Sequence, residues 1–125
     1  MLEVYSLNVT AAANSPFALN NVTIQKGCTA TLSGVGTIQL NKCGVYMVAV
    51  NGSAAAASTI QVTKNGVLQP QAQSTGTSPA FTTLVQVPTS NSNCCCSSPT
   101  LVQVVNPTDA AETLTSLNVV VTKIC

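Results

Sequence analysis

The feature that most constrains the fold of this chain is an alternation of apolar and polar residues with a period of two. This is the spacing of side chains that share one face of a β-strand, whereas an amphipathic helix repeats every 3.6 residues. The alternating runs are rich in Val, Ile and Thr, which favour pleated, half-buried strands. About eight such runs occur, at residues 4–9, 28–33, 38–40, 45–50, 60–62, 81–87, 101–105 and 117–124. The sequence therefore predicts an all-β protein.

Turn-forming residues separate these runs. Gly, Asn and Pro stand between most of them, and Asn65-Gly66 is the strongest hairpin signal because both residues tolerate a positive φ. Ala54–Ala57 has helical propensity but is too short to form a helix unaided, so we expect a loop there. Short strands at this spacing predict an antiparallel sandwich or barrel, in a single domain over residues 1–125. Residues 1–20 supply either an N-terminal strand or an anchoring arm.

One run, Val45–Val50, is apolar on both of its faces. A strand with one solvated face carries polar residues on that face. This strand is therefore either a covered central strand or one whose second face packs against another subunit. Val119–Val121 repeats the pattern near the other end of the sequence.

The chain carries very little charge. Four Lys and three acidic residues make up 6% of the sequence, against roughly 25% in an ordinary soluble domain. The lysines are spread singly and Arg is absent, so we expect neither a nucleic acid nor an anionic membrane as a partner. A near-neutral, charge-poor surface instead promotes association with other protein chains.

Targeting signals are also missing from the sequence. No apolar run approaches the ~18 residues that cross a bilayer as a helix. Met1–Tyr5 has neither the basic start nor the apolar core of a signal peptide. We therefore expect synthesis in a host cytoplasm, with release by packaging or lysis.

Few residues are available for catalysis. Asp109 and Glu112 lie three positions apart and would suit acid–base work or Ca²⁺ binding, but a solvated turn with a local cap is the favoured interpretation. The chain has no His, so its cysteines lack the commonest partner for forming a thiolate. We expect no catalytic residue, no cofactor and no enzymatic activity.

Six cysteines stand at positions 28, 43, 94, 95, 96 and 125, without the Cys-x-x-Cys spacing of a zinc site. Cys28 and Cys43 fall on strands or strand ends, where small buried thiols are favoured over a disulfide. Three alternatives remain for the cluster Cys94, Cys95, Cys96 and Cys125. One is a disulfide from the triplet to Cys125 or Cys43, the second is cross-links or a metal trap near a three-fold axis, and the third is a reduced turn.

The order of the strands carries a family resemblance. Gly44-Val45-Tyr46, preceded by the run at 38–40, resembles a segment of the tumour necrosis factor and complement globular-head superfamily. Residues 59–66, which end in Asn-Gly, resemble the strand that follows it, and residues 99–106 and 117–124 resemble the last two strands. Within the superfamily, the chain is most similar to heads of bacterial collagen-like spore-surface glycoproteins and to bacteriophage head-fibre and capsid decoration domains.

This resemblance implies an antiparallel two-sheet jelly-roll sandwich of about ten strands that forms a homotrimer. The Gly-Val-Tyr strand would lie in the inner sheet. The trimer-interface candidates are Tyr46, Val48, Val50, Val119 and Val121. No Gly-X-Y collagen stem precedes the domain, which favours a free-standing subunit on a virus capsid over the head of a stalked spore protein.

The resulting hypothesis is a structural virion protein that decorates the outer shell of a bacteriophage head. Its partners would be its own copies, the major capsid protein or another shell subunit, and host-surface glycans. The alternative is a carbohydrate- or receptor-binding head of a spore, fibre or cell-surface protein. Sugars stack on aromatic rings, and the chain has only two Tyr and two Phe, which favours the structural role.

Overall fold

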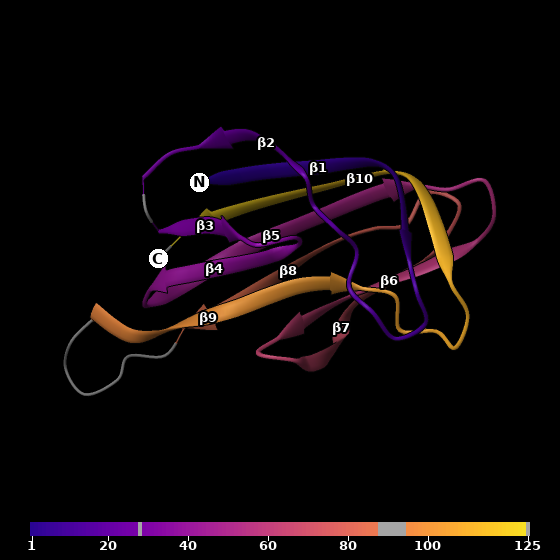
Figure 1. The fold of residues 1–125 in the computed structure, drawn as a ribbon. Coiled ribbons are helices and arrows are strands. Elements are labelled where there is room, and N and C mark those ends of the chain that lie inside the picture. The colour runs from indigo at the N-terminus through magenta and orange to yellow at the C-terminus, as the bar shows by residue number, and fades with distance from the viewer. Residues whose placement is uncertain (28, 88–94, 125) are drawn as a thin grey trace.

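The computed structural model describes residues 1–27, 29–87 and 95–124, with side chains from residue 99 onward in the last segment. Ten strands form two five-stranded sheets that face each other, and the described residues contain no helix (Figure 1). The strands are β1 (Leu2–Ala11), β2 (Asn21–Gln25), β3 (Ala30–Ser33), β4 (Thr37–Lys42), β5 (Gly44–Ser53), β6 (Ser58–Lys64), β7 (Val67–Gly76), β8 (Ala80–Val87), β9 (Cys95–Val105) and β10 (Glu112–Lys123).

The two sheets have the connectivity of a jelly roll. Sheet I has the strand order β2-β1-β10-β5-β8 and sheet II the order β3-β4-β9-β6-β7, with every pair antiparallel. From β4 onward the chain changes sheet at each connection except the β6–β7 hairpin. The predicted all-β, two-sheet jelly-roll sandwich of about ten strands is therefore confirmed.

The hydrophobic core lies between the two sheets. Sheet I contributes alternate residues of its strands, which is why the period of two is so clear in the sequence. Most core side chains are Val, Leu and Ile, and the largest fully buried ones are Tyr46 and Phe17. Phe17 follows β1, in a segment whose Pro16 forms an isolated bridge with Val105 at the end of β9. Residues 1–20 thus contain an inner strand of sheet I, between β2 and β10, and one of the main core side chains.

Local turn chemistry works as the sequence predicts. Asn65 and Gly66 join β6 to β7 with φ values of 51° and 83°, both in the left-handed region of a tight hairpin turn. Ala54–Ala57 forms the loop between β5 and β6. Both local predictions are confirmed.

Two strands, β2 and β7, were not predicted from the alternation of apolar and polar residues, and both lie at sheet edges. β2 is the outer strand of sheet I, and four of its five residues are exposed. β7 is the outer strand of sheet II and carries Pro70 and four Gln or Ser side chains, with Ala72 as its buried residue. β2 has no fully buried residue and β7 has only Ala72, so little hydrophobic periodicity is imposed on either strand.

The two ends of the described chain meet at one end of the sandwich. Leu2 in β1 pairs with Val121 in β10, and the Ile124 amide donates to the Val45 carbonyl oxygen at 2.8 Å. The loops after β1, β5 and β9 lie together at the opposite end (Figure 1). No helix in the described part of the chain is long and apolar enough to cross a membrane.

Candidate functional site

The five predicted trimer-interface residues are core residues. Tyr46, Val48, Val50, Val119 and Val121 are each at most 2% exposed and belong to the cluster between the sheets. The prediction that they form contacts between subunits is therefore wrong. Their side chains point into the sandwich, where a second chain has no access to them.

The opposite side of the same strands presents an apolar surface to the exterior. Val45, Met47 and Ala49 alternate with the core residues of β5 and are half-buried. Met47 pairs across the sheet with Leu84 of β8, and Ala49 pairs with Val120 of β10. Leu84 is 58% exposed, and β5 contains no charged residue. We call this surface the outward face and define it by Val45, Met47, Ala49, Leu84 and Val120.

The outward face explains why Val45–Val50 is apolar on both sides. One side fills the core, and the other gives an uncovered apolar patch in the middle of sheet I. Contiguous exposed apolar patches on a folded domain commonly mark interaction surfaces. The interface candidates predicted from the sequence on this strand, Tyr46, Val48 and Val50, lie on its core side instead.

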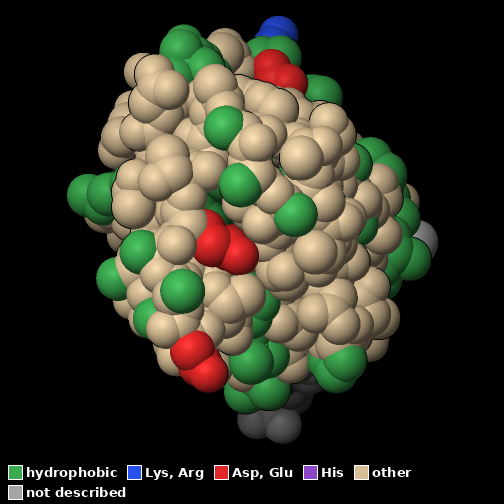
Figure 2. Space-filling view, turned by 90° about the vertical axis from the view of Figure 1, so that its right-hand side faces the viewer, with side chains coloured by type: hydrophobic (Ala, Val, Ile, Leu, Met, Phe, Trp, Pro, Cys, Tyr) green, Lys and Arg blue, Asp and Glu red, His purple; other side chains and the backbone are tan. Residues whose placement is uncertain are grey.

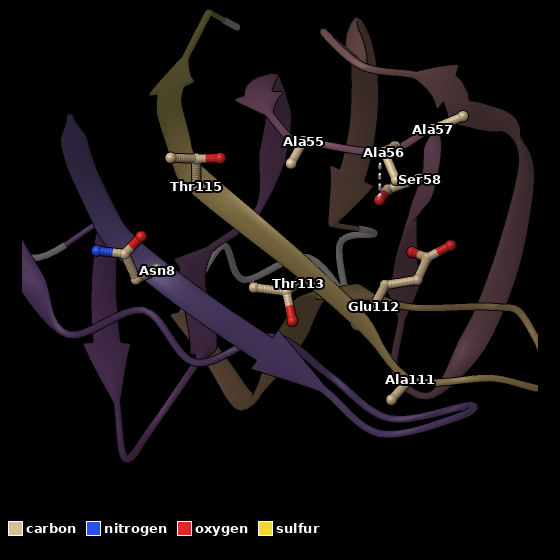
Figure 3. Close-up of a pocket in the computed structure, with 9 residues that line it drawn as sticks. All are labelled: Asn8, Ala55, Ala56, Ala57, Ser58, Ala111, Glu112, Thr113 and Thr115. Carbon is tan, nitrogen blue, oxygen red and sulfur yellow. Dashed lines mark hydrogen bonds between the residues drawn. The ribbon is translucent and has the colours of Figure 1, made fainter.

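A second feature, the acidic pocket, lies at the loop end of the sandwich. Its volume is about 420 Å³, and it is lined by Asn8, Ala55, Ala56, Ala57, Ser58, Ala111, Glu112, Thr113 and Thr115. Figure 3 shows Glu112 rising from the start of β10 toward the loop that carries Ala56 and Ser58. The surface at this end shows Asp and Glu side chains amid mostly uncharged atoms, with Lys only at its edge (Figure 2).

Asp109 and Glu112 have different environments and do not share the pocket. Asp109 is exposed in the loop between β9 and β10, and it does not line the pocket. Glu112 is half-buried: its Oε1 accepts a 3.0 Å hydrogen bond from the Thr59 amide, and its Oε2 is buried with no hydrogen-bond partner among the described residues. The expected solvated turn therefore describes Asp109 but not Glu112.

The loop that holds Asp109 is organised by Asn106, which is completely buried. Its Nδ2 donates to the carbonyl oxygen of Ala110 at 2.7 Å and to those of Ala11 and Ala12 at 3.3 Å. Its Oδ1 accepts from the amide of Thr108 at 3.0 Å and from the Thr108 hydroxyl at 2.7 Å. Asn106 thus fixes the loop backbone that leads into Glu112.

A smaller hollow of about 230 Å³ lies over sheet II. It is lined by Asn14, Pro16, Thr63, Gly66, Leu68, Gln103, Val105 and Pro107. Thr63 is 5% exposed, and its Oγ1 has no hydrogen-bond partner among the described residues. A single buried hydroxyl of this kind is commonly satisfied by one ordered water, so this hollow is the weaker of the two pockets as a ligand site.

Cys43 forms a disulfide bond. It is 4% exposed, as predicted for a small buried residue, but it is disulfide-bonded, so the preference for a reduced thiol is wrong at this position. The predicted cluster of Cys94, Cys95, Cys96 and Cys125 lies outside the described side chains, as does Cys28. Among the described residues, no group of three or more His, Cys, Asp or Glu gathers to hold a metal ion.

Comparison with solved structures identifies the fold type. The chain is similar to murine APRIL, with a TM-score of 0.66 and 11% identity over 98% of this chain and 97% of that one. It is also similar to rabbit GITRL, with a TM-score of 0.58 and 9% identity over 100% of this chain and 95% of that one. Both are ligands of the tumour necrosis factor family, so the chain has a jelly roll of that type. At these identities the likeness shows the fold alone.

Comparison of the sequence with known families and curated proteins identifies no relative. No protein-family model matches the chain, and no curated protein matches it at a significant level. The part of the sequence resemblance that concerns the tumour necrosis factor-like jelly roll is confirmed, and its link to bacteriophage or spore proteins stays a prediction.

Proposed function

We propose that this chain is a structural, non-enzymatic β-sandwich module that forms a homotrimer through the outward face of sheet I. The observation that carries the proposal is the uncovered apolar surface of Val45, Met47, Ala49, Leu84 and Val120. Burying it against two other copies would remove apolar area from water, which is the main driving force for association. Rotational symmetry would let one patch serve all three subunits.

The charge content supports the same assembly. The formal net charge is +1, and neither β5 nor β8 carries a charged side chain. Glu3 of β1 pairs with Val120 at the border of the face, where its Oε1 accepts a 2.7 Å hydrogen bond from the Thr23 hydroxyl. Copies meeting over β5 and β8 would therefore not repel each other there. Among the described residues, the other sheet packs on the opposite side of β5, and no strand covers the outward face. In this proposal, the face is completed by a second copy of the chain.

The role that we propose for the trimer is decoration of the outer shell of a bacteriophage capsid. This follows the sequence resemblance around Gly44-Val45-Tyr46, and a surface of uncharged polar side chains suits a passive cementing role. The docking partner would be the major capsid protein or another shell subunit. The second candidate function is a carbohydrate- or receptor-binding head, which the pocket at the loop end favours.

Sedimentation of matched variants tests the trimer. Leu84→Asp places a charge in the outward face, whereas Leu101→Asp places the same charge on an exposed position of β9 in sheet II. We expect the wild type and Leu101→Asp to sediment as trimers at micromolar concentration and Leu84→Asp to sediment as a folded monomer. A monomeric wild type, or a Leu84→Asp variant that remains trimeric, would overturn the proposal.

Particle composition tests the decoration role. Bacteriophage particles would be purified from lysates with the gene for this chain intact or deleted. We expect the chain to co-purify with intact particles in numbers divisible by three, and its loss to lower the temperature at which particles release DNA. If the chain stays in the soluble fraction, the capsid role is wrong even when the trimer exists.

A further inference from the structure

A row of three polar side chains crosses sheet I directly beside the outward face. Tyr5 of β1 pairs with Asn118 of β10, and Asn118 pairs on its other side with Asn51 of β5. Residues that pair directly across antiparallel strands lie on the same side of the sheet, about 5 Å apart. Asn118 is two residues from Val120, and Asn51 is two residues from Ala49, so all three share the side of the outward face. We call these three residues the polar row.

Polar side chains next to the polar row find partners within the chain. The hydroxyls of Ser53 and Ser116, the next outward pair of β5 and β10, bond to each other at 2.9 Å. On the other side of the row, Glu3 Oε1 accepts a hydrogen bond from the Thr23 hydroxyl at 2.7 Å. The side chains of the polar row, by contrast, make no hydrogen bond to any described residue. Their donors and acceptors are therefore available to water or to another molecule.

The polar row is accessible and has apolar neighbours on both sides. Asn51 is exposed, and Tyr5 and Asn118 are half-buried. Ala49 and Val120 of the outward face lie on one side of the row, and Leu7, which is 62% exposed, follows Tyr5 by two residues on the other. A molecule that covers these apolar side chains also removes water from the row. Polar groups that lose water without gaining a hydrogen bond destabilise a complex.

The chemistry of the polar row suits a second copy of the same chain. A carboxamide donates through Nδ2 and accepts at Oδ1, and a phenol also both donates and accepts. An identical copy therefore offers each group in the row the donor or acceptor that it lacks. A row of carboxylates or ammonium groups would instead repel its own copy. The polar row contains no charged residue, so it is complementary to itself in charge and in hydrogen bonding.

From this placement we propose that the polar row selects one trimeric arrangement, because Asn118 and Asn51 of each copy form hydrogen bonds with the row of a neighbouring copy. This inference rests on the proposed trimer and adds the residues that define its stoichiometry. Apolar contact is non-directional, so an apolar face alone tolerates copies that slide or rotate. Amides tolerate only the arrangement that pairs them, as a single buried Asn does in a coiled coil.

Two matched substitutions separate the loss of an amide from a gain of apolar area. Asn118→Val removes the central amide of the row. Thr82→Val also adds a valine on the same side of sheet I, at an exposed position of β8 that pairs with Ala49, but removes no amide. Valine favours strands, so both variants should fold, which far-UV circular dichroism checks.

Native mass spectrometry and sedimentation velocity measure the distribution of assemblies. We expect the wild type and Thr82→Val to form trimers alone. Asn118→Val is expected to give a mixture of dimers, trimers and larger species in which trimers hold less than about half of the chains, because association persists without its directional contacts. Asn51→Val, at the neighbouring position in the row, is expected to give a similar mixture.

Hydrogen exchange of the side-chain amides gives a second readout on the unchanged protein. In ¹⁵N-labelled wild type, the Nδ2 protons of Asn118 and Asn51 are expected to exchange with water at least about ten-fold more slowly than those of Asn8. Asn8 is an exposed residue of β1 outside the row, and its side chain makes no hydrogen bond to a described residue.

The outcomes separate this inference from the proposed trimer. A monomeric wild type overturns both. A trimeric wild type overturns the role of the polar row alone if Asn118→Val also forms only trimers, or if Asn118 and Asn51 exchange as fast as Asn8. An equal mixture from Thr82→Val would attribute the loss of uniqueness to added apolar area, and would likewise refute the role of the amides.

Discussion

The phenol oxygen of Tyr46 lies 2.7 Å from the carbonyl oxygen of Lys42 and donates a hydrogen bond to it across the turn between β4 and β5. The Lys42 amide donates back to the same phenol oxygen at 3.3 Å. Tyr46 is fully buried, so its ring fills the core while its hydroxyl holds the turn that contains Cys43 and Gly44. The tyrosine of the Gly-Val-Tyr segment therefore stabilises the protomer itself.

The Tyr46 contact predicts how two substitutions differ. Tyr46→Phe keeps the ring and loses the hydroxyl, and we expect it to lower the free energy of unfolding by about 1–2 kcal/mol. Tyr46→Asp buries a charge in the core and should prevent folding rather than separate folded subunits. Urea denaturation and far-UV circular dichroism measure both effects. A well-folded monomer of Tyr46→Asp would contradict this account.

Gly36 is predicted to be irreplaceable for a steric reason. Its φ is +98°, and a Cβ placed on it would lie 2.5 Å from the Phe17 carbonyl oxygen. Gly34, in the same turn, has φ +61° and nothing within 4 Å of the equivalent position. We expect Gly34→Ala to cost about 1–2 kcal/mol from the backbone alone and Gly36→Ala about 3 kcal/mol or more. Equal thermal midpoints for the two variants would refute the steric argument.

Asn106 is predicted to be the most sensitive polar residue of the loop that leads into β10. Asn106→Ala leaves the carbonyl oxygens of Ala11, Ala12 and Ala110 without this donor, and we expect a loss of about 3 kcal/mol. Asn106→Asp keeps the shape but directs a carboxylate at those carbonyls, so it should be at least as damaging. The matched control is Asp109→Ala, which is exposed and should change stability by less than about 0.5 kcal/mol.

The Cys43 disulfide predicts the result of a thiol count. With two of the six cysteines bonded, protein unfolded without reductant should titrate at most four thiols. Reduction should lower the free energy of unfolding by roughly 2–4 kcal/mol, as is typical for a native disulfide. Six reactive thiols in unreduced, denatured protein would exclude the bond.

The fold class and the local turns can both be predicted from the amino-acid pattern. A period of two with Val, Ile and Thr permits only strands, and the Asn65-Gly66 turn depends on the φ preferences of its own two residues. Strands β2 and β7 were not recognised, because they bury at most one side chain each and leave no alternation to detect. The sequence therefore predicts a strand where core burial imposes an alternation, and a turn where the φ preferences of its own residues decide the conformation.

Which face of β5 belongs to the core depends instead on how the two sheets pack together. Alternation places Tyr46 and Met47 on opposite sides of β5. Both sides are apolar, so the sequence does not indicate which side faces the core. The packing of sheet II against sheet I selects Tyr46 for the interior and leaves Met47 outside. In the same way, Glu112 is half-buried and accepts a hydrogen bond from the Thr59 amide, 53 positions away in the sequence. Contacts between residues so far apart depend on how the whole chain closes, and no local periodicity encodes them.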